Sequence, residues 1–291
     1  MKPFPSSELV LNADGSVYHL KLQPEQIADD IIVVGDQGRV EEVSRNFDSV
    51  ECRIQNREFI THTGMYRGKR ISVISTGIGT DNIDIVLNEL DSLVNIDLKE
   101  RLVKSTLKSL RIVRIGTSGT LMHDIPVDSV ITSSHGLGFD GLMHFYQFAQ
   151  KHDDIELADE IAQFLELPHS LNKPYVCSAD DDLFERLRIG FHQGITATAS
   201  GFYGPQGRKL RIEPAVPDLN ERMMQFTSRN GHHITNFEME TSALYGLSSA
   251  LGHKACTLCV IIANRARLEY SKNYKPAMNM LIGTVLDRLS E

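Results

Sequence analysis

The chain has 291 residues, of which 41% are hydrophobic and 23% charged, and its formal net charge is −8 at pH 7. The composition is typical of a folded globular protein, and the acidic balance without a Lys/Arg-rich cluster argues against a nucleic-acid partner. Because no run of about 18 apolar residues occurs and the first residues lack a continuous apolar core, we expect a cytoplasmic protein without a membrane partner.

Strand-like and helix-like segments alternate along nearly the whole chain, which is typical of a layered α/β fold. In the first half we expect a strand over 30–36, a helix over 37–46, a hairpin over 57–77 that turns at 66–69, a helix over 82–110 and a strand over 111–119. In the second half we expect strands over 127–136, 194–200, 233–240 and 254–265, and helices over 154–167, 181–190, 241–253 and from about 277. No repeat or long linker interrupts them, so we predict one domain.

The four cysteines do not form a disulfide framework in a chain of this length. Cys256 and Cys259 lie three apart in a predicted strand, so their thiols would point to opposite faces. No second CxxC pair completes a tetrahedral zinc site. We therefore predict that these cysteines pack in the core.

Four predicted strands end in glycine or in small polar residues, in the sequences VVGDQGR, STGIGTDN, RIGTSGT and NFEMETS. Ligands collect beyond the carboxyl ends of strands in α/β sheets, so these endings should converge on one crevice. Gly35 and Gly38 let the backbone approach an anion, and Arg39 can grip its oxygens. Arg114 and the Thr117 hydroxyl offer a similar pairing, so the sequence predicts a phosphate-sized ligand.

Other phosphate and hydrolase motifs are missing. GIGTDN has Asn82 where a dinucleotide fingerprint needs its third glycine, and no GxxxxGK[ST] loop occurs. The GxSxG elbow of a hydrolase triad is also missing. These observations argue against a dinucleotide dehydrogenase, a P-loop enzyme and a serine hydrolase.

The loop GFYGPQGRKL at 201–210 carries Phe202, Gln206 and Arg208 among three glycines and a proline. Glycine and proline break helix and strand, so these side chains are presented on irregular backbone, where binding groups are common. An aromatic ring, an amide and a guanidinium suit a flat heterocycle with carbonyl groups. A surface turn with a buried Phe is the alternative interpretation.

The segment FEME places Glu238 and Glu240 at a strand-to-helix junction, where entry into the helix separates them. They are therefore not predicted to form an acid/base pair. One carboxylate that accepts two hydrogen bonds suits a vicinal diol such as that of ribose. The alternative is that both glutamates complement the helix dipole.

In order, spacing and residue type, these motifs resemble the nucleoside phosphorylases of the single-domain α/β type, and within them the members that act on uridine. The resemblance runs from about residue 16 to residue 265. It implies one three-layer α/β/α domain over residues 1–291 with a central mixed twisted sheet, in which residues 1–15 form an N-terminal arm. It also implies phosphorolysis of uridine, with inorganic phosphate as co-substrate and no required cofactor.

The resemblance assigns roles to individual positions. The residues that match the family's phosphate site are Gly35, Arg39, Arg57, Arg114 and Thr117. Those that match its ribose site are His19, Thr117, Met239 and Glu240. Those that match its base site are Ser118, Gly119, Phe202, Gln206, Arg208 and Arg265. The resemblance implies that Arg114, Gln206 and Arg208 act in catalysis, and that His19 and Arg57 serve a neighbouring subunit's site.

Purine-specific members of the family carry an acid after the last strand, whereas this chain has Ala263, Asn264 and Arg265 there. Uracil can depart as an anion spread over its two carbonyl oxygens, so preorganised donors can replace a general acid. The base motif therefore favours a pyrimidine. A purine nucleoside phosphorylase, a hydrolytic nucleosidase and a non-catalytic nucleoside sensor on the same fold are the alternatives.

Two features bear on assembly. In bacterial relatives a monovalent cation lies at the dimer interface, near positions that match Glu58, Ile78 and Asn82, and the last of these is Ser in the relatives. The segment 94–109 is longer here than in the bacterial hexamers. We expect a homo-oligomer with shared active sites, at least a dimer, and a structural monovalent cation as an optional ligand.

Overall fold

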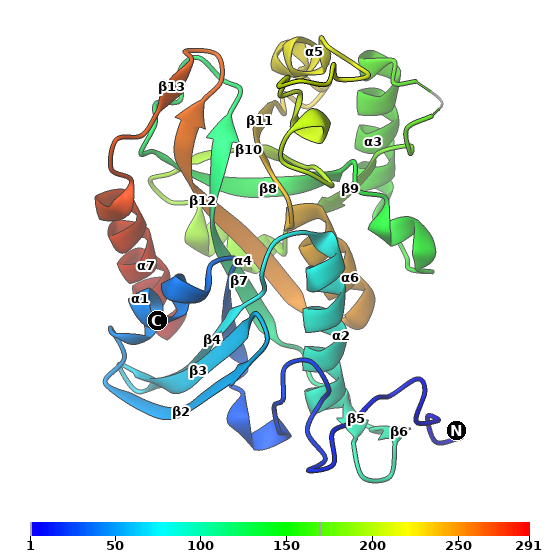
Figure 1. The fold of residues 1–291 in the computed structure, drawn as a ribbon, viewed down its shortest axis with the longest axis vertical. Helices are drawn as coiled ribbons and strands as arrows, with labels where there is room; N and C mark the ends of the chain where they lie inside the picture. Colours follow the sequence, from blue (N-terminus) through cyan, green and yellow to red (C-terminus); the bar gives the residue numbers. More distant parts are fainter. Residues whose placement is uncertain (1, 169) are drawn as a thin grey trace.

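The strand β1 (Asp30–Val34) is buried at every residue in the computed structural model, which describes residues 2–168 and 170–291 (Figure 1). A continuously buried apolar run is expected where a strand has parallel neighbours and helices on both faces. β1 pairs in parallel with β4 (Lys69–Ser75) and β7 (Arg111–Thr120). The sequence DIIVV therefore lies inside the sheet.

Around β1 the described residues form an eleven-stranded mixed sheet in the order β13-β12-β8-β10-β11-β7-β1-β4-β3-β2, with β9 beside β8. Its other strands are β2 (Ser49–Asn56), β3 (Phe59–Tyr66), β8 (Val130–Gly138), β9 (Tyr175–Ser178), β10 (His192–Thr198), β11 (Ile234–Glu238), β12 (Lys254–Asn264) and β13 (Glu269–Tyr270). A separate hairpin consists of β5 (Ile96–Asp97) and β6 (Leu102–Val103).

Part of the sheet closes on itself. β12 pairs in parallel with β7 and antiparallel with β8, and β11 pairs with both β10 and β7. Because β8 also pairs with β10, these five strands form a ring in which each pairs with two others of the ring. Closure removes exposed strand edges at this end of the molecule.

Helices cover both faces of the sheet. They are α1 (Gln37–Ser44), α2 (Thr80–Asn95), α3 (His152–Leu165), α4 (Asp181–Leu187), α5 (Leu219–Gln225), α6 (Thr241–Leu251) and α7 (Lys275–Ser290). Figure 1 shows α1 and α7 together on one side of the sheet, and α2 and α6 together on the other. None of the helices in the described ranges is long and apolar enough to cross a bilayer.

Alternate side chains of β1 pack in two different parts of the hydrophobic core. Ile31 and Val33 pack in a cluster with residues of α2 and α6, whereas Ile32 and Val34 pack in a second cluster with residues of α1, α4 and α7. Successive side chains of a strand point to opposite faces, so one strand contributes to both layers. The predicted three-layer α/β arrangement with a mixed sheet is confirmed.

Most predicted elements are present within a few residues of their expected bounds, including the hairpin β3–β4. The helix predicted over 82–110 is wrong in its second half, because α2 ends at Asn95 and the chain continues into the β5–β6 hairpin. Arg101 lies in the left-handed region at φ 59° and its carbonyl accepts from the Phe4 N–H at 2.8 Å. Contacts with the N-terminal segment thus replace helical ones.

Both cysteines of the CTLC segment are free and buried, as predicted. Cys256 packs in the cluster with α7, whereas the Cys259 sulfur accepts from the Arg114 guanidinium at 3.2 Å. Their side chains therefore serve different surroundings, as the spacing of three in a strand requires.

Candidate active site

The cavity that contains the predicted site has a volume of about 780 Å³. It lies where the carboxyl ends of β1, β4 and β11 meet the second half of β7, as the strand endings predict. All predicted site residues line it except His19, Arg57 and Arg265. The lining residues that we did not predict are Asp36, Gln37, Gly77, Phe237, Glu238, Ile262, Ala263, Tyr270 and Tyr274.

Arg39 lies in the first turn of α1, after the Gly35 turn, and only 6% of its surface is exposed. One terminal nitrogen donates weakly to the Ile115 carbonyl at 3.4 Å, and its Nε has no hydrogen-bond partner. No carboxylate in the described part of the chain forms an ion pair with it. A buried, uncompensated charge is costly, so this geometry indicates an anionic ligand.

Arg114 projects from β7 over Gly116, whose missing side chain leaves the space that the guanidinium occupies. It forms a close ion pair with Glu240, and its other terminal nitrogen lies 3.3 Å from a Glu238 oxygen. Burial disfavours the charged guanidinium, but the carboxylates of Glu240 and Glu238 outweigh burial and raise the pKa of Arg114. Arg114 therefore stays charged.

Glu238 and Glu240 have different surroundings, as the junction predicted. The Glu238 carboxylate accepts from the backbone N–H groups of Glu240 at 2.9 Å and Thr241 at 3.0 Å, and so satisfies the start of α6. Glu240 accepts from the Gly79 N–H at 2.8 Å. Burial raises the pKa of Glu240, Arg114 lowers it, and Glu238 raises it further.

The loop after β10 brings the predicted base-binding side chains together. The Gln206 side chain is buried and its Oε1 accepts from Arg208 at 2.5 Å. The Arg208 guanidinium lies 3.8 Å from the centroid of the half-exposed Phe202 ring. Burial, and then the neighbouring charge of Arg265, lower the pKa of Arg208 to about 10. Arg265 lies outside the cavity lining and donates to the Gln206 carbonyl at 3.0 Å.

None of the carboxylates that line the cavity in the described part of the chain comes from this loop. They are Asp36, Glu58, Glu238 and Glu240, which end or follow β1, β2 and β11. In the stretch 263–265, where purine-specific relatives are expected to carry an acid, Asn264 donates to the carbonyls of Met122 at 3.0 Å and Ile125 at 2.8 Å. Its amide therefore serves the fold.

The Ser118 hydroxyl is held by a buried series of side-chain hydrogen bonds that the sequence did not predict. The Asn236 amide donates to the Ser118 hydroxyl at 3.0 Å, and its oxygen accepts from Thr196 at 2.9 Å. Thr196 in turn lies 2.5 Å from the Ser133 hydroxyl. These residues come from β7, β11, β10 and β8, so only the closed ring of strands brings them together.

His19 and Arg57 lie outside the cavity of their own chain. The His19 Nδ1 is 2.7 Å from Glu89 Oε1, and Asn56 donates to the His19 carbonyl at 2.7 Å. The exposed Arg57 guanidinium lies 5.3 Å from the Tyr18 ring centroid. These contacts order both side chains at the surface. That they complete the site of a neighbouring subunit stays a prediction.

Glu58, Ile78 and Asn82 all line the main cavity and gather around Gly77, which has a φ of 72°. The Cβ of any other residue at position 77 would meet the Asn82 amide and the Glu58 side chain. The carboxylate of Glu58 and the amide oxygen of Asn82 are oxygen ligands of the kind that hard cations prefer. The donor set fits a monovalent cation, and its presence stays a prediction.

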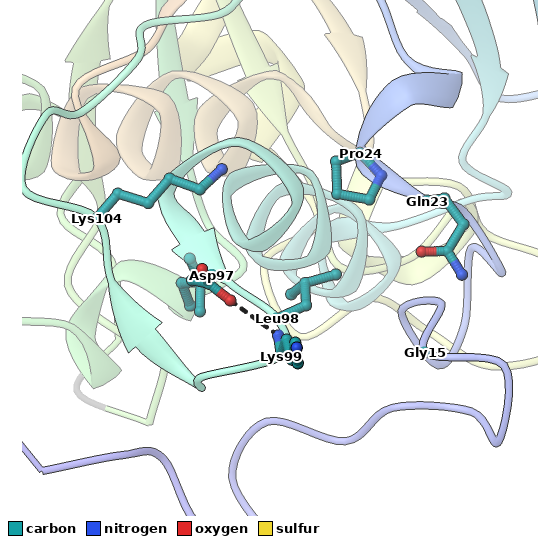
Figure 2. Close-up of a pocket in the computed structure, with 8 residues that line it drawn as sticks. Gly15, Gln23, Pro24, Asp97, Leu98, Lys99 and Lys104 are labelled. Carbon is teal, nitrogen blue, oxygen red and sulfur yellow. Dashed lines mark hydrogen bonds between the residues drawn. The ribbon is translucent and has the colours of Figure 1, made fainter.

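A second cavity, of about 460 Å³, lies between the N-terminal segment and the β5–β6 hairpin (Figure 2). Asp97 accepts there from the Lys99 N–H at 3.0 Å, and Lys104 donates to the Val94 carbonyl at 2.8 Å. These polar groups hold the hairpin itself. None of the predicted site residues lines this cavity, so the main cavity is the candidate active site.

The fold and the arginine-lined cavity are those of a known class of protein. The family model described as the phosphorylase superfamily matches residues 29–283, and the chain belongs to this superfamily.

Relatives of two specificities are similar to the chain. It is 28% identical to a uridine phosphorylase of Thermococcus kodakarensis, over 94% of this chain and 86% of the relative. It is 27% identical to a DeoD-type purine nucleoside phosphorylase of Colwellia psychrerythraea, over 84% of this chain and 85% of the relative. The crystal structure of a Trypanosoma brucei nucleoside phosphorylase with uridine phosphorylase activity aligns with a TM-score of 0.88 and 30% identity, over 97% of this chain and 99% of the other.

Proposed function

We propose that the protein is a uridine phosphorylase, which converts uridine and inorganic phosphate reversibly to uracil and ribose 1-phosphate. The reaction would serve salvage and breakdown of pyrimidine nucleosides. The observation that carries the proposal is the base loop, in which a buried Gln206 amide is held by Arg208 and which contributes no carboxylate to the described cavity lining. The similarity to two proteins with this activity supports it.

The base would lie between Phe202 and the Gln206 amide. A carboxamide offers a donor and an acceptor side by side, which matches O2 and N3–H of uracil. Although Gln206 Oε1 already accepts from Arg208, a carbonyl oxygen has a second lone pair for N3–H. Arg208 would donate to O4, and Arg265 would support the loop through the Gln206 carbonyl.

Phosphate would bind between Arg39, Arg114 and the Thr117 hydroxyl, with Arg57 contributed by a neighbouring subunit. The unpaired charge of Arg39 gives this position its preference for an anion. Met239 would lie under the sugar, and Glu240 would accept from the 2′ and 3′ hydroxyls of ribose. His19 of the neighbouring subunit would reach the 5′ hydroxyl.

In the reaction a phosphate oxygen bonds to C1′ while the bond from C1′ to N1 breaks, and the electron pair of that bond stays on uracil. The ribose passes through an oxocarbenium-like state, and the uracil anion takes its proton from water after release. Gln206 and Arg208 stabilise the developing charge on the base, so no covalent intermediate is needed. Phosphate is the only co-substrate.

The decisive assay is uracil release from uridine with and without inorganic phosphate, with inosine as a second substrate. We expect release from uridine that depends on phosphate, and little release of hypoxanthine from inosine. Release without phosphate would instead identify a nucleosidase. Uridine binding without any turnover would identify a nucleoside sensor and contradict the proposal.

The second candidate is a purine nucleoside phosphorylase, which the similarity to the DeoD-type relative favours. This activity needs a group that protonates the purine. The matching stretch, 263–265, has no carboxylate, and the amide of its Asn264 is bound to carbonyls. Phosphate-dependent turnover of inosine that exceeds turnover of uridine would establish this candidate in place of the first.

A further inference from the structure

A small cavity of about 120 Å³ lies between α1 and the first turn of α7, beside the main cavity. We call it the side pocket, and its lining residues are Asp36, Arg39, Glu42, Arg45, Tyr274, Lys275, Met278 and Asn279. Figure 1 shows the two helices side by side, and Arg45 joins them by donating to Asn279 at 2.7 Å. Asp36, Arg39 and Tyr274 also line the main cavity.

Three cationic side chains line the side pocket, against two carboxylates, Asp36 and Glu42. Arg39 is buried with an unpartnered Nε, whereas Arg45 and Lys275 are exposed and have no ion pair among the described residues. Of the two carboxylates in the lining, Asp36 is already engaged by the Gly38 N–H at 2.8 Å. Cations therefore lie both at the opening and at the base of the pocket.

The start of α7 (Lys275–Ser290) contributes side chains to the pocket, namely those of Lys275, Met278 and Asn279. Its backbone offers few free donors, because the Lys275 N–H donates to Asn273 Oδ1 at 3.3 Å and Pro276 has no N–H. The attraction for an oxyanion therefore comes from the cationic side chains. Arg39, whose Nε has no hydrogen-bond partner, lines both cavities and so connects the side pocket to the phosphate position of the main cavity.

We propose that the side pocket is a second phosphate-binding position, which passes the anion to Arg39 while a nucleoside occupies the main cavity. The inference rests on the proposed function, in which phosphate lies beneath the ribose and a bound nucleoside covers it. Nucleoside-sized ligands need cavities of about 300–1,000 Å³, so the side pocket admits a tetrahedral oxyanion and excludes the nucleoside. Phosphate then enters through the side pocket, and the nucleoside enters through the main cavity.

The kinetic test reverses the charge at the opening with the double variant Arg45→Glu/Lys275→Glu. The control is Lys173→Glu/Arg229→Glu, which makes the same change in net charge at exposed residues outside both cavities. At low salt we expect the first variant to show a kcat/KM for phosphate, at saturating uridine, at least about five-fold below the control. The difference should shrink toward about 0.5 M salt as screening increases.

Two kinetic outcomes overturn the proposal. One is an equal kcat/KM for phosphate in the two double variants. The other is a parallel fall in kcat/KM for uridine at saturating phosphate, which would mean that the substitutions disturb the whole site.

A second measurement does not depend on turnover. The chain has no tryptophan, so Tyr274→Trp places a single emission reporter on the wall shared by the two cavities. In this background we expect phosphate to change the emission, with a dissociation constant at least about five-fold higher when Arg45 and Lys275 are reversed than in the control. Equal constants, or no emission response to phosphate, overturn the proposal. Failure of every nucleoside assay would overturn the proposed function alone.

Discussion

Arg208 is oriented before any ligand binds. It donates to the Phe202 carbonyl at 2.6 Å and to Gln206 at 2.5 Å, and it packs over the Phe202 ring. Donors that are already in place need no reorganisation when charge develops on a leaving group. At the scale of single residues, the base loop therefore contributes preorganised donors as well as shape.

We predict that Arg208→Ala lowers kcat/KM for uridine by about 10²–10³, the usual cost of losing one donor to a developing oxyanion. The dissociation constant for phosphate should change less than two-fold, because Arg39 and Arg114 remain. Arg211→Ala, an exposed arginine of the same loop, is the control and should leave both constants unchanged. Steady-state kinetics that show an unchanged kcat and KM for uridine in Arg208→Ala would contradict the base-site assignment.

The sequence predicted most cavity residues because they follow strand ends in recognisable motifs. Arg39, for example, follows two glycines at a strand-to-helix turn. Tyr270 and Tyr274 gave no such signal, because they reach the cavity only when the chain returns after β12. That Arg39 lacks a counter-ion is likewise a property of the packed structure, since carboxylates are frequent nearby in the sequence.

At the scale of elements, the local sequence pattern predicted the wrong conformation where contacts with distant segments determine the structure. Leucines at 98, 102 and 110 suggest a helix, yet the chain turns after Asn95. The Asn95 amide oxygen accepts from the Lys108 N–H at 2.7 Å, and Arg101 donates to the Phe4 carbonyl at 2.7 Å. Tertiary contacts override a weak helical preference here. The edge strand β2 was missed because its residues alternate without a fully buried face.

The contact of β8 with α3 contains a histidine whose charge is disfavoured. His135 lies 4.0 Å from the Asp154 carboxylate and its ring is 4.9 Å from that of His232. Burial, and then the charges of His232 and Lys151, lower the pKa of His135 to about 4. Burial raises the pKa of Asp154, so the two groups are both driven toward their neutral forms.

We predict that this histidine makes folding sensitive to mild acid. The unfolded chain takes up a proton at about pH 6.5 and the folded chain only near pH 4, so stability is lost as the pH falls between these values. Between pH 7 and 4.5, urea unfolding of the wild type should lose about 2 kcal/mol more than that of His135→Asn. His152→Asn, on the exposed start of α3, should behave as wild type. If the free energies of unfolding of wild type and His135→Asn differed by the same amount at pH 7 and at pH 4.5, the prediction would be refuted.

At the scale of the whole molecule, a single chain does not bring all of the proposed binding groups to its own cavity. His19 and Arg57 are ordered at the surface by Glu89 and Tyr18, away from the cavity that they are expected to serve. A symmetric dimer in which each chain contributes its surface group to the other cavity would complete both sites.

We predict that His19→Ala and Glu240→Ala subunits, each inactive alone, recover activity when they are mixed. In a hybrid dimer one cavity combines the intact Glu240 of one chain with the intact His19 of the other. Random exchange should then restore about a quarter of the wild-type activity, because half of the dimers are hybrids with one intact site each. Uracil release by hybrids of confirmed composition is the measurement, and inactive hybrids would rule out shared sites.

The ion pair between Arg114 and Glu240 joins the group proposed for phosphate to the group proposed for ribose. In the empty protein these two side chains satisfy each other, so the first substrate to arrive must compete with an internal partner. On the proposed roles, phosphate bound to Arg114 would free the Glu240 carboxylate to accept from the sugar, and the reverse would also apply. We therefore expect the two substrates to bind with positive cooperativity, in which by thermodynamic linkage each increases the affinity for the other by the same factor.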